Sequence, residues 1–269
     1  MIIDFHTHVF PDKIAEGTIA ALERGGFARA HTNGTRAGLL SALSEAGADI
    51  AVNLPVMTKS TQFESVTRFA GEINCAEYSS KRIISFAGIH PDCEDAEGKL
   101  SELKGAGFLG VKIHPDYQST FIDDERYVRI LKCAKALDLI VVTHAGQDGA
   151  YPGQPIKCTP CRVLNLLDKI GGYSKLVLAH LGGNEMHDEV YSQLAGEEVY
   201  FDTALCLREL DEESFKKLIL KHGAHRILFA TDSPWRDIGE EIDILKSYNL
   251  GADVENKIFS ENARSLLGI

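Results

Sequence analysis

The stretch Ile2-Ile3-Asp4-Phe5-His6-Thr7-His8 is the part of the chain from which its fold is best inferred. It is a short apolar run that ends in two histidines. In a β-strand, positions i and i+2 project from the same face, so the imidazoles of His6 and His8 should face one point. Imidazole is the commonest side-chain ligand for transition metals. The stretch therefore predicts a strand that ends in a pair of metal ligands.

Three later segments have the same form, an apolar run that ends in a side chain able to bind a metal. They are residues 139–144, 176–180 and 227–232, which end in His144, His180 and Asp232. A single histidine at a strand end is more often a hydrogen-bonded structural residue, but four such strand ends are hard to explain by chance. In a parallel barrel the carboxyl ends of the strands share one face, where the active site lies. The four segments together predict a metal site at that face.

Composition limits the class of protein. The chain has 269 residues, which suits one large domain and the roughly 250 residues of an α/β barrel. A formal net charge of −11 argues against a nucleic-acid surface, which would need a basic patch. No apolar run approaches the roughly 18 residues of a membrane span, and the start of the chain does not resemble a signal peptide. Six scattered cysteines are typical of reduced thiols, so we expect a cytoplasmic protein.

Apolar, β-branched runs alternate with amphipathic segments along the whole chain. Strands are predicted at 2–7, 50–54, 83–87, 110–114, 139–144, 175–180, 199–203 and 226–231. Helices are predicted at 12–23, 36–47, 61–79, 94–105, 123–137, 160–170, 185–195, 211–222, 238–247 and 254–267. Nearly continuous apolar strands are typical of a buried parallel sheet. No linker interrupts the pattern, which predicts a single (β/α)8 TIM barrel over residues 1–269.

The predicted strand ends give the candidate site residues. In chain order they are His6 and His8, His90, Lys112 and His114, His144, His180, Asp202 and Asp232. Asp4 shares the inward face of the strand-1 histidines, and we expect it to support the ligands rather than to bind metal.

Several motifs together resemble the amidohydrolase superfamily. They are Asp4-Phe5-His6-Thr7-His8, Val142-Thr143-His144-Ala145-Gly146, Leu178-Ala179-His180-Leu181-Gly182-Gly183, Phe229-Ala230-Thr231-Asp232-Ser233-Pro234-Trp235 and the closing residues 261–268. The resemblance is to the amidohydrolase-related branch (amidohydrolase 2), which includes metal-dependent hydrolases and aminocarboxymuconate-semialdehyde-type decarboxylases. It implies a distorted barrel in which His6, His8, His144 and Asp232 bind the metal. The motifs are specific for the branch and carry little information about the substrate.

Metal chemistry then suggests roles for the catalytic candidates. A divalent ion, with zinc expected first and manganese second, lowers the pKa of its bound water toward ~7. Asp232 would bind the metal and accept the proton of that water as it attacks a carbonyl. His180 would polarise the carbonyl or move protons. One ion is favoured, but a second could bind if His180 and a carboxylated Lys112, as in some family members, became its ligands.

The remaining candidates are assigned to substrate binding. They are Lys112 in its cationic form, His114, His90, Arg208 and Trp235. The two histidines have an equally good interpretation as structural loop residues. Arg208 would bind a carboxylate and Trp235 a ring.

The leading functional hypothesis is a metal-dependent hydrolase acting on a small amide, ester or lactone, anionic substrates included. The alternative on the same scaffold is a non-oxidative decarboxylase. A nuclease of the TatD type is disfavoured, because Lys112 stands where that family places a glutamate. A metal-binding barrel without activity is disfavoured by the complete ligand set. The partner expected is a small molecule, with no nucleic acid and no membrane, and a homo-oligomer is allowed.

Overall fold

The computed structural model describes residues 1–25 and 29–269. The chain forms two compact units, each assembled from separate stretches of sequence. Unit 1 comprises Met1–Asn53, Ile73–Ile84 and Asp202–Ile269, and unit 2 comprises Leu54–Glu72 and Ser85–Phe201. The expected single domain over residues 1–269 stays a prediction.

Unit 1 is built around strand β1 (Ile3–Thr7), every residue of which is buried. On one side β1 pairs in parallel with β2 (Ile50–Asn53), and β3 (Arg82–Ser85) follows in the same sheet. On the other side it meets the segment after β9 (Ile227–Leu228), where the Asp232 amide donates to the His6 carbonyl at 2.9 Å. The segment that carries His6 and the segment that carries Asp232 are therefore neighbours.

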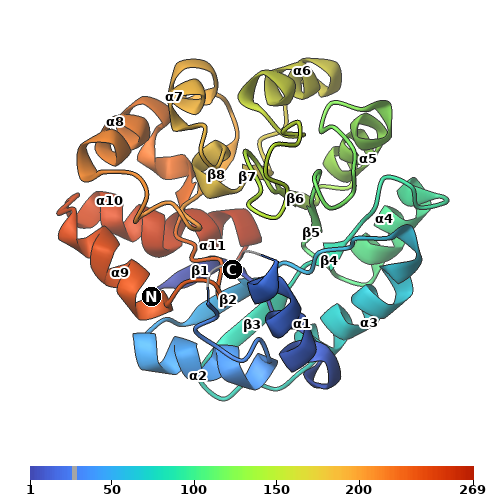
Figure 1. Ribbon diagram of the computed structural model, residues 1–269, viewed down its shortest axis with the longest axis horizontal. Coiled ribbons are helices and arrows are strands. Elements are labelled where there is room, and N and C mark those ends of the chain that lie inside the picture. The colour runs from blue at the N-terminus through green and yellow to red at the C-terminus, as the bar shows by residue number, and fades with distance from the viewer. Residues whose placement is uncertain (26–28) are drawn as a thin grey trace. The chain divides into compact units, whose positions relative to one another are not determined.

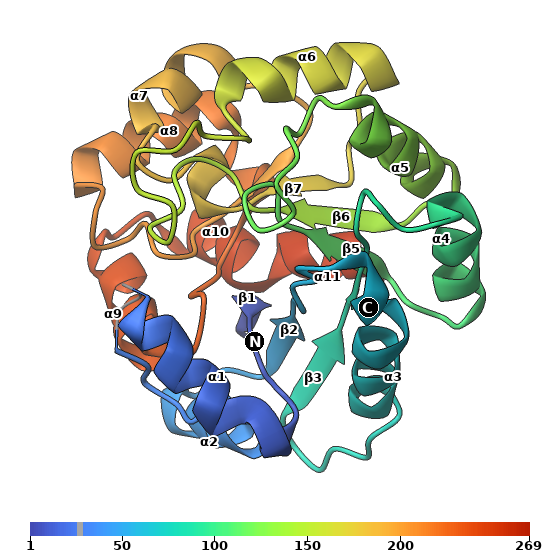
Figure 2. The ribbon, with the colours of Figure 1, turned by 45° about the vertical axis from the view of Figure 1, so that its right-hand side comes forward.

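Helices flank this sheet at positions that local sequence signals explain. In unit 1 they are α1 (Asp12–Arg24), α2 (Arg36–Ala46), α8 (Glu212–His222), α9 (Ile238–Ser247), α10 (Ala252–Asn256) and α11 (Asn262–Leu267). Helix α2 begins after Thr35, whose hydroxyl accepts the Gly38 amide, and ends at Gly47 with φ 69°. It packs against α9, as Figure 2 shows.

Unit 2 carries parallel strands that pair in the order of the sequence. They are β4 (Ala87–Gly88), β5 (Gly110–Ile113), β6 (Ile140–Thr143), β7 (Leu176–Leu178) and β8 (Tyr200–Asp202), of which the last residue, Asp202, belongs to unit 1. Helices α4 (Ala96–Gly105), α5 (Glu125–Ala136) and α6 (Pro160–Ile170) lie on the outer side of these strands (Figure 1). Strands β5 to β7 are buried at every position, as expected of a covered parallel sheet.

Several predicted elements differ from the structure; the predicted strand 226–231, for example, is only β9, and the predicted helix 254–267 is α10 and α11 with a π-helical turn between them. The predicted strand 83–87 is interrupted at Phe86 and forms β3 and β4, which belong to different sheets. The predicted helix 61–79 is α3 (Phe63–Asn74) and ends five residues early. The predicted helix 185–195 is a short α7 (His187–Glu189) followed by a π-helical turn, Val190–Leu194. No helix among the described residues is long and apolar enough to cross a membrane.

Candidate active site

Unit 1 brings three predicted metal ligands together. Nε2 of His8 lies 2.9 Å from Oδ1 of Asp232, and Nε2 of His6 lies 3.5 Å from the same oxygen. His6 and Asp232 are buried and His8 is half-buried. Both rings thus direct one nitrogen at one carboxylate oxygen, as their i, i+2 spacing in a strand requires. The ligand atoms of the three residues lie within 4.8 Å of one another.

Asp202 fixes the orientation of His6. Its Oδ2 lies 2.9 Å from Nδ1 of His6, and its side chain is fully buried at the end of β8. A carboxylate partner keeps the proton on Nδ1, so the lone pair of Nε2 faces Asp232. The sequence placed Asp202 at a strand end and gave it no role. Its position at a strand end was the available signal, and this did not reveal that it pairs with His6.

Asp4 supports the cluster of His6, His8 and Asp232 through hydrogen bonds to neighbouring groups. Its carboxylate accepts hydrogen bonds from the Thr231 hydroxyl at 2.6 Å, the Thr231 amide at 3.0 Å and the His6 amide at 3.2 Å. It therefore joins the backbones beside His6 and Asp232, as a supporting residue should. Burial raises its pKa from 3.8 to about 7, although these hydrogen bonds act in the opposite direction.

Unit 2 holds a second group of strand-end histidines. Nδ1 of His144, after β6, lies 3.0 Å from Nε2 of His180, after β7. One of these two nitrogens carries the shared proton. The ring of His114, after β5, stacks on His144 with centroids 4.3 Å apart and an interplanar angle of 11°. The structure thus collects candidates from three successive strands of unit 2.

His114 is oriented by partners on both ring nitrogens. The Tyr117 amide donates to Nδ1 at 3.4 Å, so Nε2 carries the proton and points at Oδ2 of Asp148, 3.3 Å away. The ligand atoms of His114, His144 and Asp148 lie within 4.8 Å of one another. Asp148 belongs to the loop after β6, and no sequence signal indicated it.

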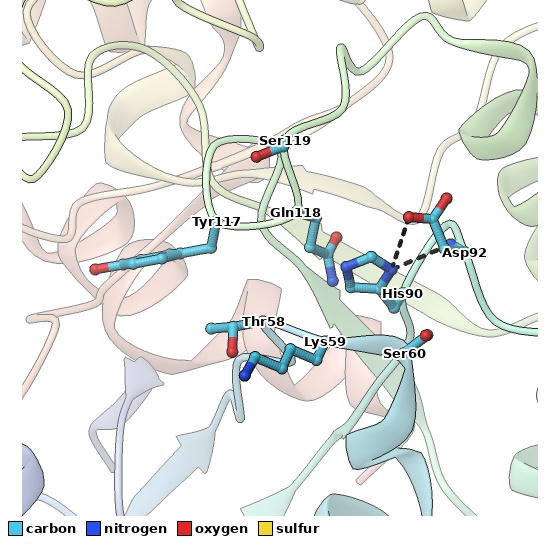
Figure 3. Close-up of a pocket in the computed structure, with 8 residues that line it drawn as sticks. All are labelled: Thr58, Lys59, Ser60, His90, Asp92, Tyr117, Gln118 and Ser119. Atoms are coloured by element: carbon cyan, nitrogen blue, oxygen red, sulfur yellow. Dashed lines mark hydrogen bonds and ion pairs between the residues drawn. The ribbon is translucent and has the colours of Figure 1, made fainter.

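His90, one strand earlier, also accepts a backbone amide at Nδ1 (Figure 3). The sequence His-Pro-Asp occurs at His90 and again at His114. The Asp92 amide donates to Nδ1 of His90 at 3.1 Å, so Nε2 carries the ring proton. Burial lowers the pKa of His90 below its usual 6.5, against the opposing effect of Asp92, which favours the neutral ring near pH 7.

The other predicted substrate-binding residues are Lys112, Arg208 and Trp235. Lys112 is in β5 and only 1% exposed. Arg208 is bound within unit 1 to Glu240 and to Glu241, the latter at 2.8 Å. Trp235 is buried, and its amide donates to the Asp232 carbonyl. Since Arg208 already has two carboxylate partners and Trp235 has little exposed surface, their roles in substrate binding stay predictions.

We expect Asp116→Asn to stabilise the protein at high pH. Burial, followed by the nearby charge of Asp148, raises the pKa of Asp116 from 3.8 to about 6. Ionising it in the folded state therefore costs stability as the pH rises from about 4 to about 6, and the cost is then constant at higher pH. At pH 8 the variant should gain about 1–3 kcal/mol after allowance for solvent screening, and the gain should shrink toward pH 4.

Urea unfolding at pH 4.5 and pH 8 measures this difference. The exposed Asp243→Asn, which changes charge identically, serves as the control. An equal effect of Asp116→Asn at both pH values would contradict the expectation.

Comparison with known proteins identifies the family of the chain. A family model described as amidohydrolase matches residues 3–269. No curated protein sequence matches the chain closely enough to count as a relative.

Solved structures similar to the chain include decarboxylases. A 2,6-dihydroxybenzoate decarboxylase in complex with 2,6-dihydroxybenzoate has a TM-score of 0.74 and 17% identity, covering 100% of this chain and 99% of its own. A dihydroxybenzoic acid decarboxylase from Polaromonas sp. JS666, with bound manganese and the inhibitor 2-nitroresorcinol, has a TM-score of 0.73, 17% identity and coverages of 99% and 96%. An uncharacterised TIM-barrel protein from Bordetella bronchiseptica has a TM-score of 0.73, 16% identity and coverages of 99% and 98%. The chain therefore has the TIM-barrel fold that the sequence predicts.

Proposed function

Because the chain belongs to the amidohydrolase family, we propose that it is a metal-dependent decarboxylase that releases CO₂ from a small carboxylic acid. The observation that carries the metal dependence is the convergence of His6 and His8 on one oxygen of Asp232. Decarboxylation is preferred because similar folds belong to decarboxylases of dihydroxybenzoates. Hydrolysis, the leading hypothesis from the sequence, becomes the second candidate.

The residues of unit 1 fit a divalent ion. Two imidazole nitrogens and a carboxylate oxygen within 4.8 Å form a donor set that suits manganese as well as zinc. Asp202 anchors the far nitrogen of His6, as carboxylates commonly do behind a metal-binding histidine. We add His144 to the proposed metal ligands because the resemblance to the amidohydrolase superfamily implies it.

A bound divalent ion would supply a Lewis acid that orients and polarises an oxygen of the substrate. One ion stays the favoured number. The alternative, a second ion bound through Lys112 and His180, also stays a prediction. Manganese in a similar structure gives no support to the expected preference for zinc.

The residues of the protein must supply one proton to the substrate. In decarboxylation the electron pair of the breaking C–C bond passes to the carbon that carried the carboxylate, and that carbon takes up a proton as CO₂ leaves. We assign delivery of this proton to Asp232. His180, 3.0 Å from His144, is assigned to proton exchange with solvent, because a neutral imidazole both donates and accepts.

Product analysis tests the proposal. Metal-replete protein is incubated with 2,6-dihydroxybenzoate and other carboxylated phenols, and separately with lactones, amides and esters. Release of CO₂ from a carboxylated phenol, absent in the His8→Ala variant, is the expected result. Turnover confined to the lactone, amide or ester set would contradict it.

Hydrolysis stays a second candidate because of one feature. Oδ1 of Asp232, beside the two strand-1 histidines, is placed to accept a proton from a water molecule. The same assay separates the two, since a hydrolase yields a cleaved bond and no CO₂.

A further inference from the structure

The segment of unit 1 that leads to the proposed ligand Asp232 lies outside any regular strand. Strand β9 ends at Leu228, and residues 229–232 continue from it without helical or strand structure. Each residue of this segment is at most 5% exposed. Buried backbone amides need hydrogen-bond partners wherever they lie. The groups that hold these amides therefore determine where the Asp232 carboxylate lies.

Two amides of this segment are held by side chains. The Ala230 amide donates to the Thr203 hydroxyl at 2.9 Å, and the Thr231 amide donates to the Asp4 carboxylate at 3.0 Å. The other two amides of the segment donate to backbone carbonyls, each at 2.9 Å. Thr203 and Asp4 thus replace the neighbouring strand that would hold these groups in a regular sheet.

The Thr203 hydroxyl satisfies both polar backbone groups of Ala230. Besides accepting the Ala230 amide, it donates to the Ala230 carbonyl at 2.9 Å. A hydroxyl has one donor, so this donor is committed to the contact. The Thr203 amide donates to the Leu228 carbonyl at 3.0 Å, and the Thr203 side chain is completely buried. Thr203 is therefore bound to this part of the chain at two positions.

Thr203 also adjoins the carboxylate that orients His6. It directly follows Asp202, whose Oδ2 lies 2.9 Å from Nδ1 of His6 and whose Oδ1 accepts the Ala204 amide at 3.1 Å. The backbone around Thr203 thus holds the Asp202 carboxylate, whereas its side chain holds the segment two residues before Asp232. A single threonine connects the support of one proposed metal ligand with the backbone of another.

We propose that Thr203 is a positioning residue for the metal site and sets the spacing between the His6 imidazole and the Asp232 carboxylate. The inference rests on the proposed metal-dependent function and adds a residue behind its ligands. Replacing the hydroxyl by a methyl group leaves the buried N–H and C=O groups of Ala230 without partners, which costs free energy. The segment must then shift to find new partners, and Asp232 shifts with it. Metal affinity falls as a result.

Titration with manganese tests this without turnover, because the electron paramagnetic resonance signal of the free ion gives the amount bound. Thr203→Val keeps the shape of the side chain and loses the hydroxyl. Its dissociation constant should be about tenfold higher than that of the wild type, at the lower end of the losses caused by removing a group behind a metal ligand. Thr203→Ser should stay within about twofold of the wild type, because its hydroxyl offers the same donor and acceptor.

Thr35→Val is the matched control, since it makes the same substitution in the same unit. The Thr35 hydroxyl caps helix α2 by accepting the Gly38 amide at 3.0 Å. Its loss destabilises the helix rather than the ligand segment, so manganese affinity should equal that of the wild type. If Thr203→Val does not fold, Thr203→Ala replaces it with the same expected loss, because it places no methyl group against the polar atoms of Ala230.

The other outcomes reject the inference or separate it from the proposed function. A Thr203→Val affinity within about twofold of the wild type, or an equal loss in Thr203→Ser, would overturn it. So would an equal loss in Thr35→Val, since the effect would then follow the stability of unit 1. A Thr203-dependent affinity without CO₂ release retains the inference and rejects the decarboxylase. CO₂ release with an affinity that does not depend on Thr203 does the reverse, and a wild type that binds neither manganese nor zinc rejects both.

Discussion

Replacing Asp232 by asparagine is expected to reduce kcat by at least about a hundredfold while the protein stays folded and retains metal. An asparagine amide cannot hold or give up the reacting proton at neutral pH, and loss of a general acid or base typically costs about 10²–10⁴ in rate. The backbone should tolerate the change. Asp232 has φ 66°, a left-handed conformation that asparagine adopts more readily than most residues. Its amide hydrogen bond to the His6 carbonyl is independent of the side chain.

Metal content and kcat must be measured on the same samples, because a missing metal would mimic a missing acid. The substrate is the carboxylic acid identified by the CO₂ assay. If the metal-replete variant turns over within a few-fold of the wild type, Asp232 is a ligand alone. The proton transfer would then pass to His180, and His180→Asn would be the more damaging change.

Most of the fold could be predicted because its signals are local. Helix α2 follows a threonine cap and stops at a glycine with positive φ, and α6 begins with Pro160 after Thr159, whose hydroxyl accepts the Arg162 amide. The buried strands are continuous in apolar residues. The break at Phe86 could not be predicted, because an apolar run does not reveal which neighbouring strand each residue pairs with.

The candidate site was predictable only in part. The strand-1 histidines follow from a spacing of two in a strand, and Asp232 follows from the end of another apolar run. The pairing of Asp202 with His6 joins residues 196 positions apart and depends on tertiary structure. Asp148 lies in a loop without periodicity, so no local pattern connects it with His114. Supporting residues are thus harder to predict than ligands.

The second large expected effect is a loss of metal affinity. His8→Ala should weaken metal binding by more than about a hundredfold, because it deletes one of the nitrogens that converge on Asp232. Asp202→Asn should weaken it less, by about 10–100-fold, since the carboxylate orients His6 without reaching the metal itself. His225→Ala, an exposed histidine of unit 1, is the control and should have no effect.

This order of effects is a stronger test than any single variant. Two measurements give the metal affinity of each variant: the dissociation constant from competition with a chelator, and the metal bound per protein after dialysis. The His8→Ala variant should bind metal most weakly and Asp202→Asn less weakly, whereas His225→Ala should bind it as tightly as the wild type. Stoichiometric metal in dialysed His8→Ala would remove this histidine from the ligand set. An Asp202→Asn variant as damaged as His8→Ala would instead make Asp202 a ligand, because loss of an orienting group leaves all the binding atoms in place. Circular dichroism of each variant excludes unfolding as the cause.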